Sequence, residues 1–253
     1  MISSPTLPYL VLSLFIFYCL PSLGKELRTN QVIFHQAPDW LTEYKLQAVI
    51  DRVQSFLEWD LNKIEAFGYG DQGVFNSKHN LSFSVDAIFK KSDSTIHVAP
   101  NVDATLFERV FGHELVHAIF FQKHKQAIPI WLEEGLANHV SQHGPPDYHW
   151  LVNKSWGDVT EMGHPNKGLL EPKLHYTIST ALIEMIESKC SLRDLLQLSV
   201  GKKMESYLTT YCDIKEINTS FRKWVEIQAL LPYVKDRSTK TTRGPWWKNR
   251  QKR

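Results

Sequence analysis

Residues 110–121 read V-F-G-H-E-L-V-H-A-I-F-F, and the only strongly polar side chains among them are His113, Glu114 and His117. A helix that is apolar nearly all round is a buried helix, and burying two imidazoles and a carboxylate is costly unless something satisfies them. At 3.6 residues per turn, His113 and His117 lie one turn apart on the same face, with Glu114 beside them. The H-E-x-x-H spacing therefore predicts a zinc site with two histidine ligands and a glutamate general base.

A second helix is expected shortly downstream, where residues 129–138 read P-I-W-L-E-E-G-L-A-N. Pro129 is typical of a helix start, and two carboxylates follow it in the first turn. The combination of H-E-L-V-H with W-L-E-E-G-L-A resembles the gluzincin metallopeptidases, in particular the peptidase MA-like domains. In that family the glutamate before the glycine is the third zinc ligand, so the resemblance implies that Glu134 completes the ligand set. It also implies that Glu114 is the catalytic base, and that Glu133 is a neighbour outside the ligand set, facing solvent or supporting a ligand.

Related families are disfavoured by single positions. A metzincin would need glycine at position 120 and histidine at position 123, where this chain has Phe120 and Lys123. Thermolysin-like enzymes have an aspartate four residues after the ligand glutamate, where this chain has Asn138. No G-x-M-E-N stretch, the amine-anchoring motif of the aminopeptidase branch, is present. An endopeptidase acting on a peptide or protein substrate is therefore favoured over an aminopeptidase.

The resemblance implies hydrolysis of peptide bonds. Three protein ligands leave a fourth position for water, and Glu114 removes a proton from that water before it attacks the carbonyl. A further donor usually stabilises the oxyanion, and the candidates are Tyr176, His175, Tyr148 and His149. Tyr176 is preferred because related domains place a tyrosine at the start of the helix that follows the glutamate helix, although a simple packing role stays open.

The expected fold class is α+β and zincin-like, with a small mixed N-terminal sheet, the active-site helix and a mainly helical C-terminal lobe in one domain over residues 25–234. Periodicity predicts strands at residues 31–36, 81–87 and 95–99, and one long amphipathic helix at residues 41–67. Later helices are expected at residues 176–187, 192–200 and 214–230.

Two segments of this fold are expected to contact substrate. The resemblance implies that residues 95–99 form the edge strand that binds an extended peptide by strand addition, with His97 as an ordinary strand residue. Residues 144–166 form a long aromatic-rich connection, which is typical of a lid or a binding loop.

The N-terminus reads as a targeting segment. A 12-residue apolar run at residues 9–20 is too short for a comfortable membrane span, and small residues at Ser22 and Gly24 favour signal-peptide cleavage before Lys25. The mature chain is then secreted or periplasmic. The segment before the run lacks Lys and Arg, so an uncleaved N-terminal membrane anchor stays open.

Cleavage would leave Cys190 and Cys212, which can form a disulfide in an oxidising compartment or remain two buried thiols.

Residues 235–253 carry eight Lys or Arg, one Asp, and the pair Trp246 and Trp247. This tail suits an anionic surface, although a disordered solubilising tail is the simpler interpretation, and no specific nucleic-acid partner or oligomeric state is indicated. The alternative function is a non-catalytic or latent zinc-site protein that acts as a secreted surface-binding module.

Overall fold

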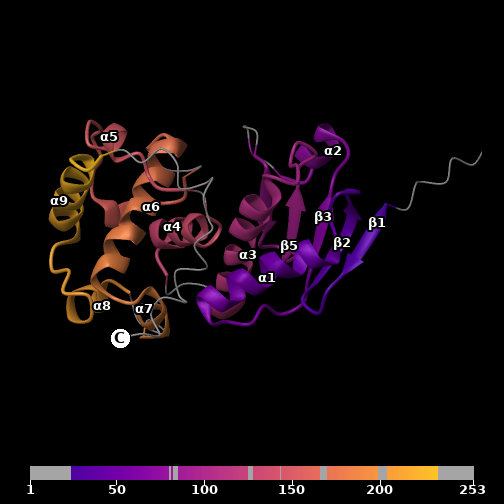
Figure 1. Ribbon diagram of the computed structural model, residues 1–253, viewed down its shortest axis with the longest axis horizontal. Helices are drawn as coiled ribbons and strands as arrows, with labels where there is room; N and C mark the ends of the chain where they lie inside the picture. Colours follow the sequence, from indigo (N-terminus) through magenta and orange to yellow (C-terminus); the bar gives the residue numbers. More distant parts are fainter. Residues whose placement is uncertain are drawn as a thin grey trace, which may run out of the picture.

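The computed structural model describes residues 24–79, 81, 85–124, 128–142, 144–165, 170–198 and 204–232. It has a mixed five-stranded sheet in its N-terminal half and a helical C-terminal half, with α3 and α4 between them (Figure 1). The α+β class is therefore confirmed. The strands are β1 (Lys25–Arg28), β2 (Val32–Ala37), β3 (Ile64–Gly68), β4 (Ala87–Lys90) and β5 (Thr95–Val98). The helices are α1 (Glu43–Leu57), α2 (Gln72–Asn76), α3 (Phe107–His124), α4 (Ile130–Val140), α5 (Tyr148–Leu151), η1 (Val159–Glu161), α6 (Pro172–Lys189), α7 (Leu192–Leu198), α8 (Glu205–Thr210) and α9 (Ile217–Ala229).

The strand order is β1-β2-β3-β5-β4, in which β2, β3 and β5 are parallel while β1 and β4 are antiparallel to their neighbours. The prediction that residues 95–99 form an edge strand is therefore wrong. A tight turn with Ser94 at positive φ folds β4 back along β5, so β5 is paired on both sides and β4 is the edge. The strand expected at residues 81–87 falls partly outside the described residues, and β4 starts only at Ala87.

The single helix predicted for residues 41–67 is a helix, a loop and a strand. Helix α1 starts after Thr42, whose hydroxyl accepts a hydrogen bond from the Lys45 backbone N–H. It ends before Glu58, which has the left-handed backbone conformation. Ile64 continues the three- and four-residue apolar spacing but lies on β3, where buried and less buried residues alternate. Helix α1 and strand β3 both bury apolar side chains in the same core, and together these residues showed the three- and four-residue spacing of one helix. The spacing of apolar residues alone therefore gave the wrong secondary structure here.

Helix α3 lies against the sheet. Phe107 and Phe111 on α3 stack on each other, and Phe34 on β2 packs against both, with its ring centroid 6.0 and 5.8 Å from theirs. All three rings are fully buried, and aromatic contacts of this geometry add to the free energy gained by burying their area. This packing fixes the axis of α3, and with it the direction in which His113 and His117, in its second and third turns, project.

The helical half begins with α4, which crosses α6 at very close range. A Cβ atom added to Gly135 would collide with the backbone oxygen of Ser179 and would lie 2.7 Å from Ile183 Cγ1. Asn138, one turn further along α4, donates to Thr180 Oγ1 at 3.0 Å. The expected helices at residues 176–187, 192–200 and 214–230 are confirmed in outline, while α8 and the short helices within residues 144–165 were not predicted.

Within the described residues, no helix combines the length and the apolar character needed to cross a membrane. The expected leader, apart from Gly24, and the basic tail lie outside the described residues.

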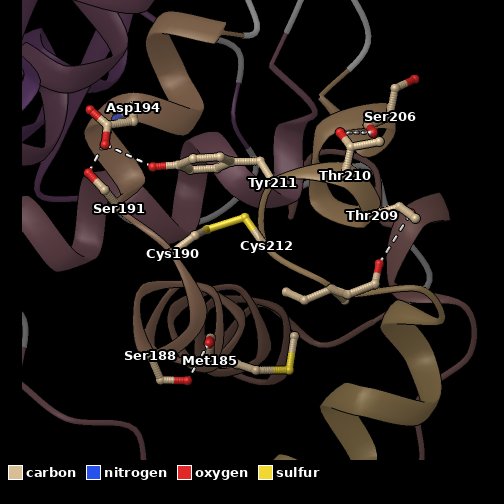
Figure 2. The surroundings of a disulfide bond; sticks show 11 residues. Met185, Ser188, Cys190, Ser191, Asp194, Ser206, Thr209, Thr210, Tyr211 and Cys212 are labelled. Carbon is tan, nitrogen blue, oxygen red and sulfur yellow. Dashed lines mark hydrogen bonds between the residues drawn. A yellow bond between two sulfur atoms is a disulfide. The ribbon is translucent and has the colours of Figure 1, made fainter.

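Cys190 and Cys212 are joined in a disulfide, which decides between the two alternatives left by the sequence. Cys190 caps the C-terminal end of α6, and Cys212 follows α8, so the bond holds α8 against α6 (Figure 2). A hydrogen bond from the Tyr211 hydroxyl to Asp194 on α7 lies beside it, at 2.8 Å.

Breaking this disulfide should lower the free energy of unfolding by about 3 kcal/mol, because the unfolded chain regains the freedom of a loop of roughly 20 residues. The measurement is urea denaturation of the protein and of the Cys190→Ala/Cys212→Ala variant. Dithiothreitol should shift the midpoint of the unsubstituted protein toward that of the variant and leave the variant unchanged. Equal midpoints for all four samples would contradict the prediction.

Candidate metal centre

The three predicted ligands converge. His113 and His117 project from α3 with their Nε2 atoms 3.1 Å apart, and Glu134 Oε2 on α4 lies 3.6 and 3.7 Å from them. The side chains are 12%, 13% and 5% exposed respectively. Helix α3 supplies two donors because residues four apart share a face, and α4 supplies the third because it packs across α3.

This triangle of donors fits a divalent ion. Bonds of about 2.0–2.1 Å at tetrahedral angles place donor atoms roughly 3.3 Å apart, close to the separations seen here. Glu134 Oε2 is buried and accepts no hydrogen bond within the part of the chain that is described, so the atom aimed at the two imidazoles is the one that a cation would satisfy. These residues can therefore hold a metal ion.

The electrostatics of the site favour a cation. Burial alone would raise the pKa of Glu134, but the charges of His117 and His113 lower it to about 2. Burial would lower the pKa of His117, but Glu134 and the hydrogen-bonded Glu133 raise it to about 10. The carboxylates thus stay ionised, and the buried site prefers to contain positive charge.

Glu133 supports a ligand. Its Oε1 accepts a hydrogen bond from His117 Nδ1 at 2.7 Å, and both side chains are largely buried. A proton held on Nδ1 leaves the Nε2 lone pair directed toward Glu134 and His113, which is the arrangement that a metal-bound histidine needs. The sequence left open whether Glu133 faces solvent or supports a ligand. This hydrogen bond shows that it supports His117.

Substituting the two adjacent glutamates should separate their roles. We expect Glu134→Ala to lose the metal, because a donor atom disappears, and Glu133→Ala to retain one ion with about 10–100-fold weaker affinity. Metal content after dialysis and a competitive chelator titration measure the two effects. Loss of the ion from Glu133→Ala with normal binding by Glu134→Ala would show that the third ligand has been misassigned.

Glu114 and Tyr176 both lie at this site. Glu114 is partly buried next to His113 on α3, and its charge helps to raise the pKa of His117 and of Tyr176. The Tyr176 ring stands edge-on to the His113 ring, with centroids 6.3 Å apart. Burial, followed by the charges of Glu134 and Glu114, raises the pKa of the Tyr176 hydroxyl, which therefore stays protonated and can donate.

The other candidate donors are placed elsewhere or are already engaged. Tyr148 donates to Glu184 at 2.7 Å and accepts from Trp224, in the packing of α5 against α6 and α9. His175 is buried within α6, with Nε2 2.7 Å from the Gly163 carbonyl oxygen. His149 is exposed on α5.

His97 is not brought to the metal centre. Its ring nitrogens lie 2.6 Å from the Tyr69 hydroxyl and 2.8 Å from Thr95 Oγ1, and it belongs to the sheet. Its description as an ordinary strand residue is therefore confirmed.

Sequence reasoning missed two residues near the site. His164 is partly buried; burial lowers its pKa, and its electrostatic partners include Glu134 and His117. The charge of Lys91, just after β4, lowers the pKa of Glu133 and of His164. The only available signal was the position of His164 in the aromatic-rich connection, and nothing in the sequence pattern singled out Lys91.

No known protein-family model matches this chain, and no curated protein matches its sequence. The interpretation of the centre therefore rests on the two motifs and on the geometry described above.

Proposed function

We propose that this protein is a zinc-dependent peptidase of the gluzincin type, related to the peptidase MA-like domains, which cleaves internal bonds of peptides or proteins. The observation that carries the proposal is the convergence of His113, His117 and Glu134 beside the non-ligand carboxylate of Glu114. A structural zinc site usually has four protein ligands, often cysteines, and needs no general base. The set of two nitrogens and one carboxylate oxygen is one of those found at catalytic zinc sites.

The side chains have separate tasks in the proposed reaction. A zinc ion bound by the three ligands would supply Lewis acidity, lowering the pKa of water toward about 7 and polarising the scissile carbonyl. Glu114 accepts the proton of the attacking water and later transfers it to the leaving amine. The Tyr176 hydroxyl donates a hydrogen bond to the carbonyl oxygen as negative charge develops there. Glu133 holds His117 in the required tautomer throughout.

The substrate strand is proposed to lie along β4. This strand replaces residues 95–99 in that role because it is the sheet edge that packs against α3, with Phe89 against Phe121 at 5.6 Å. An extended peptide can hydrogen-bond to an unpaired edge, whereas β5 has no free side. The absence of the amine-anchoring motif favours internal bonds over N-terminal trimming.

A mixed peptide library tests the activity. We expect cleavage at internal bonds that stops with a chelator and returns when zinc is added. Removal of single N-terminal residues would exclude the endopeptidase interpretation while leaving the metal centre intact. A zinc-loaded protein that cleaves nothing would favour the non-catalytic or latent alternative.

A further inference from the structure

The C-terminal end of α9 exposes a cluster of apolar side chains. Ile227, Leu230 and Leu231 are 47%, 86% and 51% exposed, whereas Phe221 and Val225 of the same helix are buried. The amides of Leu230 and Leu231 bond to the carbonyls of Ile227 and Gln228, so the backbone keeps turning past the end of α9. At this spacing the three exposed side chains share one face, and we call them the α9 terminal cluster.

Exposed cations lie on α9 and next to α5, the helix that packs against it. Lys223, one turn before Ile227, is exposed, although Glu226 on the same helix is exposed too. Helix α5 lies beside α9, tied to it by the bond from Trp224 Nε1 to the Tyr148 hydroxyl. On α5 itself, the centroid of the Trp150 ring lies 4.8 Å from Lys154 Nζ and 4.6 Å from Lys173 Nζ.

The chain that follows the cluster is strongly cationic. Residues 235–253 carry eight Lys or Arg against one Asp, together with Trp246 and Trp247. An exposed apolar cluster, followed from Lys235 on by a tail with many cations and two tryptophans, supplies two signals for membrane binding: apolar insertion and electrostatic attraction. Either is weak alone, and together they give stable binding to a membrane surface.

We propose that the α9 terminal cluster inserts into the headgroup region of an anionic lipid bilayer, with the basic tail held on the phosphate groups. A polyanion such as a glycan or a nucleic acid would use the positive charges but would gain nothing from three exposed apolar side chains, whereas a bilayer uses both. The cluster therefore decides in favour of lipid. This inference is independent of the proposed peptidase activity.

The position of α9 is compatible with a working metal centre on a membrane-bound protein. Helix α9 lies at one end of the molecule and β1 at the other, while α3 and α4, which carry the metal ligands, lie between them (Figure 1). Docking through α9 leaves the β4 edge uncovered, so the sheet half projects away from the lipid.

Vesicle sedimentation of the full mature chain tests the proposal. The probes are phosphatidylcholine vesicles with and without about a third of phosphatidylglycerol, in low and high salt. We expect binding to the anionic vesicles that weakens with salt, and much weaker binding to pure phosphatidylcholine. Ile227→Ser/Leu230→Ser/Leu231→Ser should lower the partition coefficient by at least tenfold, since burying one large apolar side chain accounts for about that factor.

Two further variants complete the test. Tyr44→Ser/Val74→Ser removes exposed apolar residues of the N-terminal half and should bind like the unsubstituted protein. Lys248→Gln/Arg250→Gln/Lys252→Gln/Arg253→Gln should weaken binding to anionic vesicles at least tenfold. Circular dichroism checks that each variant is folded. Unchanged binding by the α9 triple variant, binding to heparin but not to vesicles, or equal binding to both vesicle types would each overturn the proposal.

Discussion

Replacing Glu114 by glutamine should abolish peptide hydrolysis, with a fall in kcat of about 10²–10⁴-fold, while one metal ion per chain remains bound. Glutamine has nearly the shape of glutamate but cannot accept the proton from water at neutral pH. Because Glu114 does not belong to the converging ligand set, its loss leaves His113, His117 and Glu134 in place. The measurement pairs kcat on a peptide identified in the library with metal content by mass spectrometry.

Glu108 provides a matched control on the same helix. It is exposed and pairs with Arg52 at 3.0 Å, so Glu108→Gln should change kcat by less than twofold. Loss of the ion together with activity in Glu114→Gln would mean that Glu114 binds the metal, and full activity would remove it from the role of general base.

Gly135→Ala is expected to lower the free energy of unfolding by about 3 kcal/mol and to impair catalysis in the molecules that remain folded. The added methyl group would collide with the Ser179 backbone, which cannot rotate away as a side chain could. Overpacking of this kind costs about 1–3 kcal/mol or more, and a better helix propensity returns less than about 1 kcal/mol. Separating α4 from α6 also moves Glu134 relative to Tyr176, because each residue lies within one turn of the contact.

Urea denaturation and kcat at a temperature well below the transition measure the two effects. Gly157→Ala is the control, because a Cβ atom at that position meets nothing within 4 Å and the backbone is not left-handed. A Gly135→Ala protein as stable and active as the Gly157→Ala protein would show that the close approach of α4 and α6 matters little.

The three candidate metal ligands were predictable because the information lies in short stretches. His113 and His117 are one helical turn apart, so their common face follows from geometry. Glu134 was placed by the W-L-E-E-G-L-A resemblance, and the structure brings it together with the two histidines in a group that could hold a metal ion. The partner of His117 was not predictable, since either a solvent-facing or a supporting position suited Glu133 until the angle between α3 and α4 was known.

The errors in the fold have a common cause, which is that local spacing does not report pairing between distant segments. Ile64 fits a helical stripe and also fits a strand that alternates buried and exposed residues. Whether β5 or β4 forms the edge depends on a turn at residues 91–94 that folds one strand back on the other. The charge of Glu134 acts on the pKa of His164, and this influence between distant parts of the sequence could not be predicted from a motif.

The disulfide implies an order of events during biosynthesis. All three candidate metal ligands lie within residues 113–134, so the ribosome adds them well before it adds Cys212. Chains generally fold from the N-terminus as they emerge, and the sheet half with α3 is therefore complete while most of the helical half is still unmade. Cys190 and Cys212 can be oxidised to the disulfide only after α8, which lies between them, has been made. A covalent step far along the chain from the candidate metal ligands thus follows the synthesis of the segment that carries them.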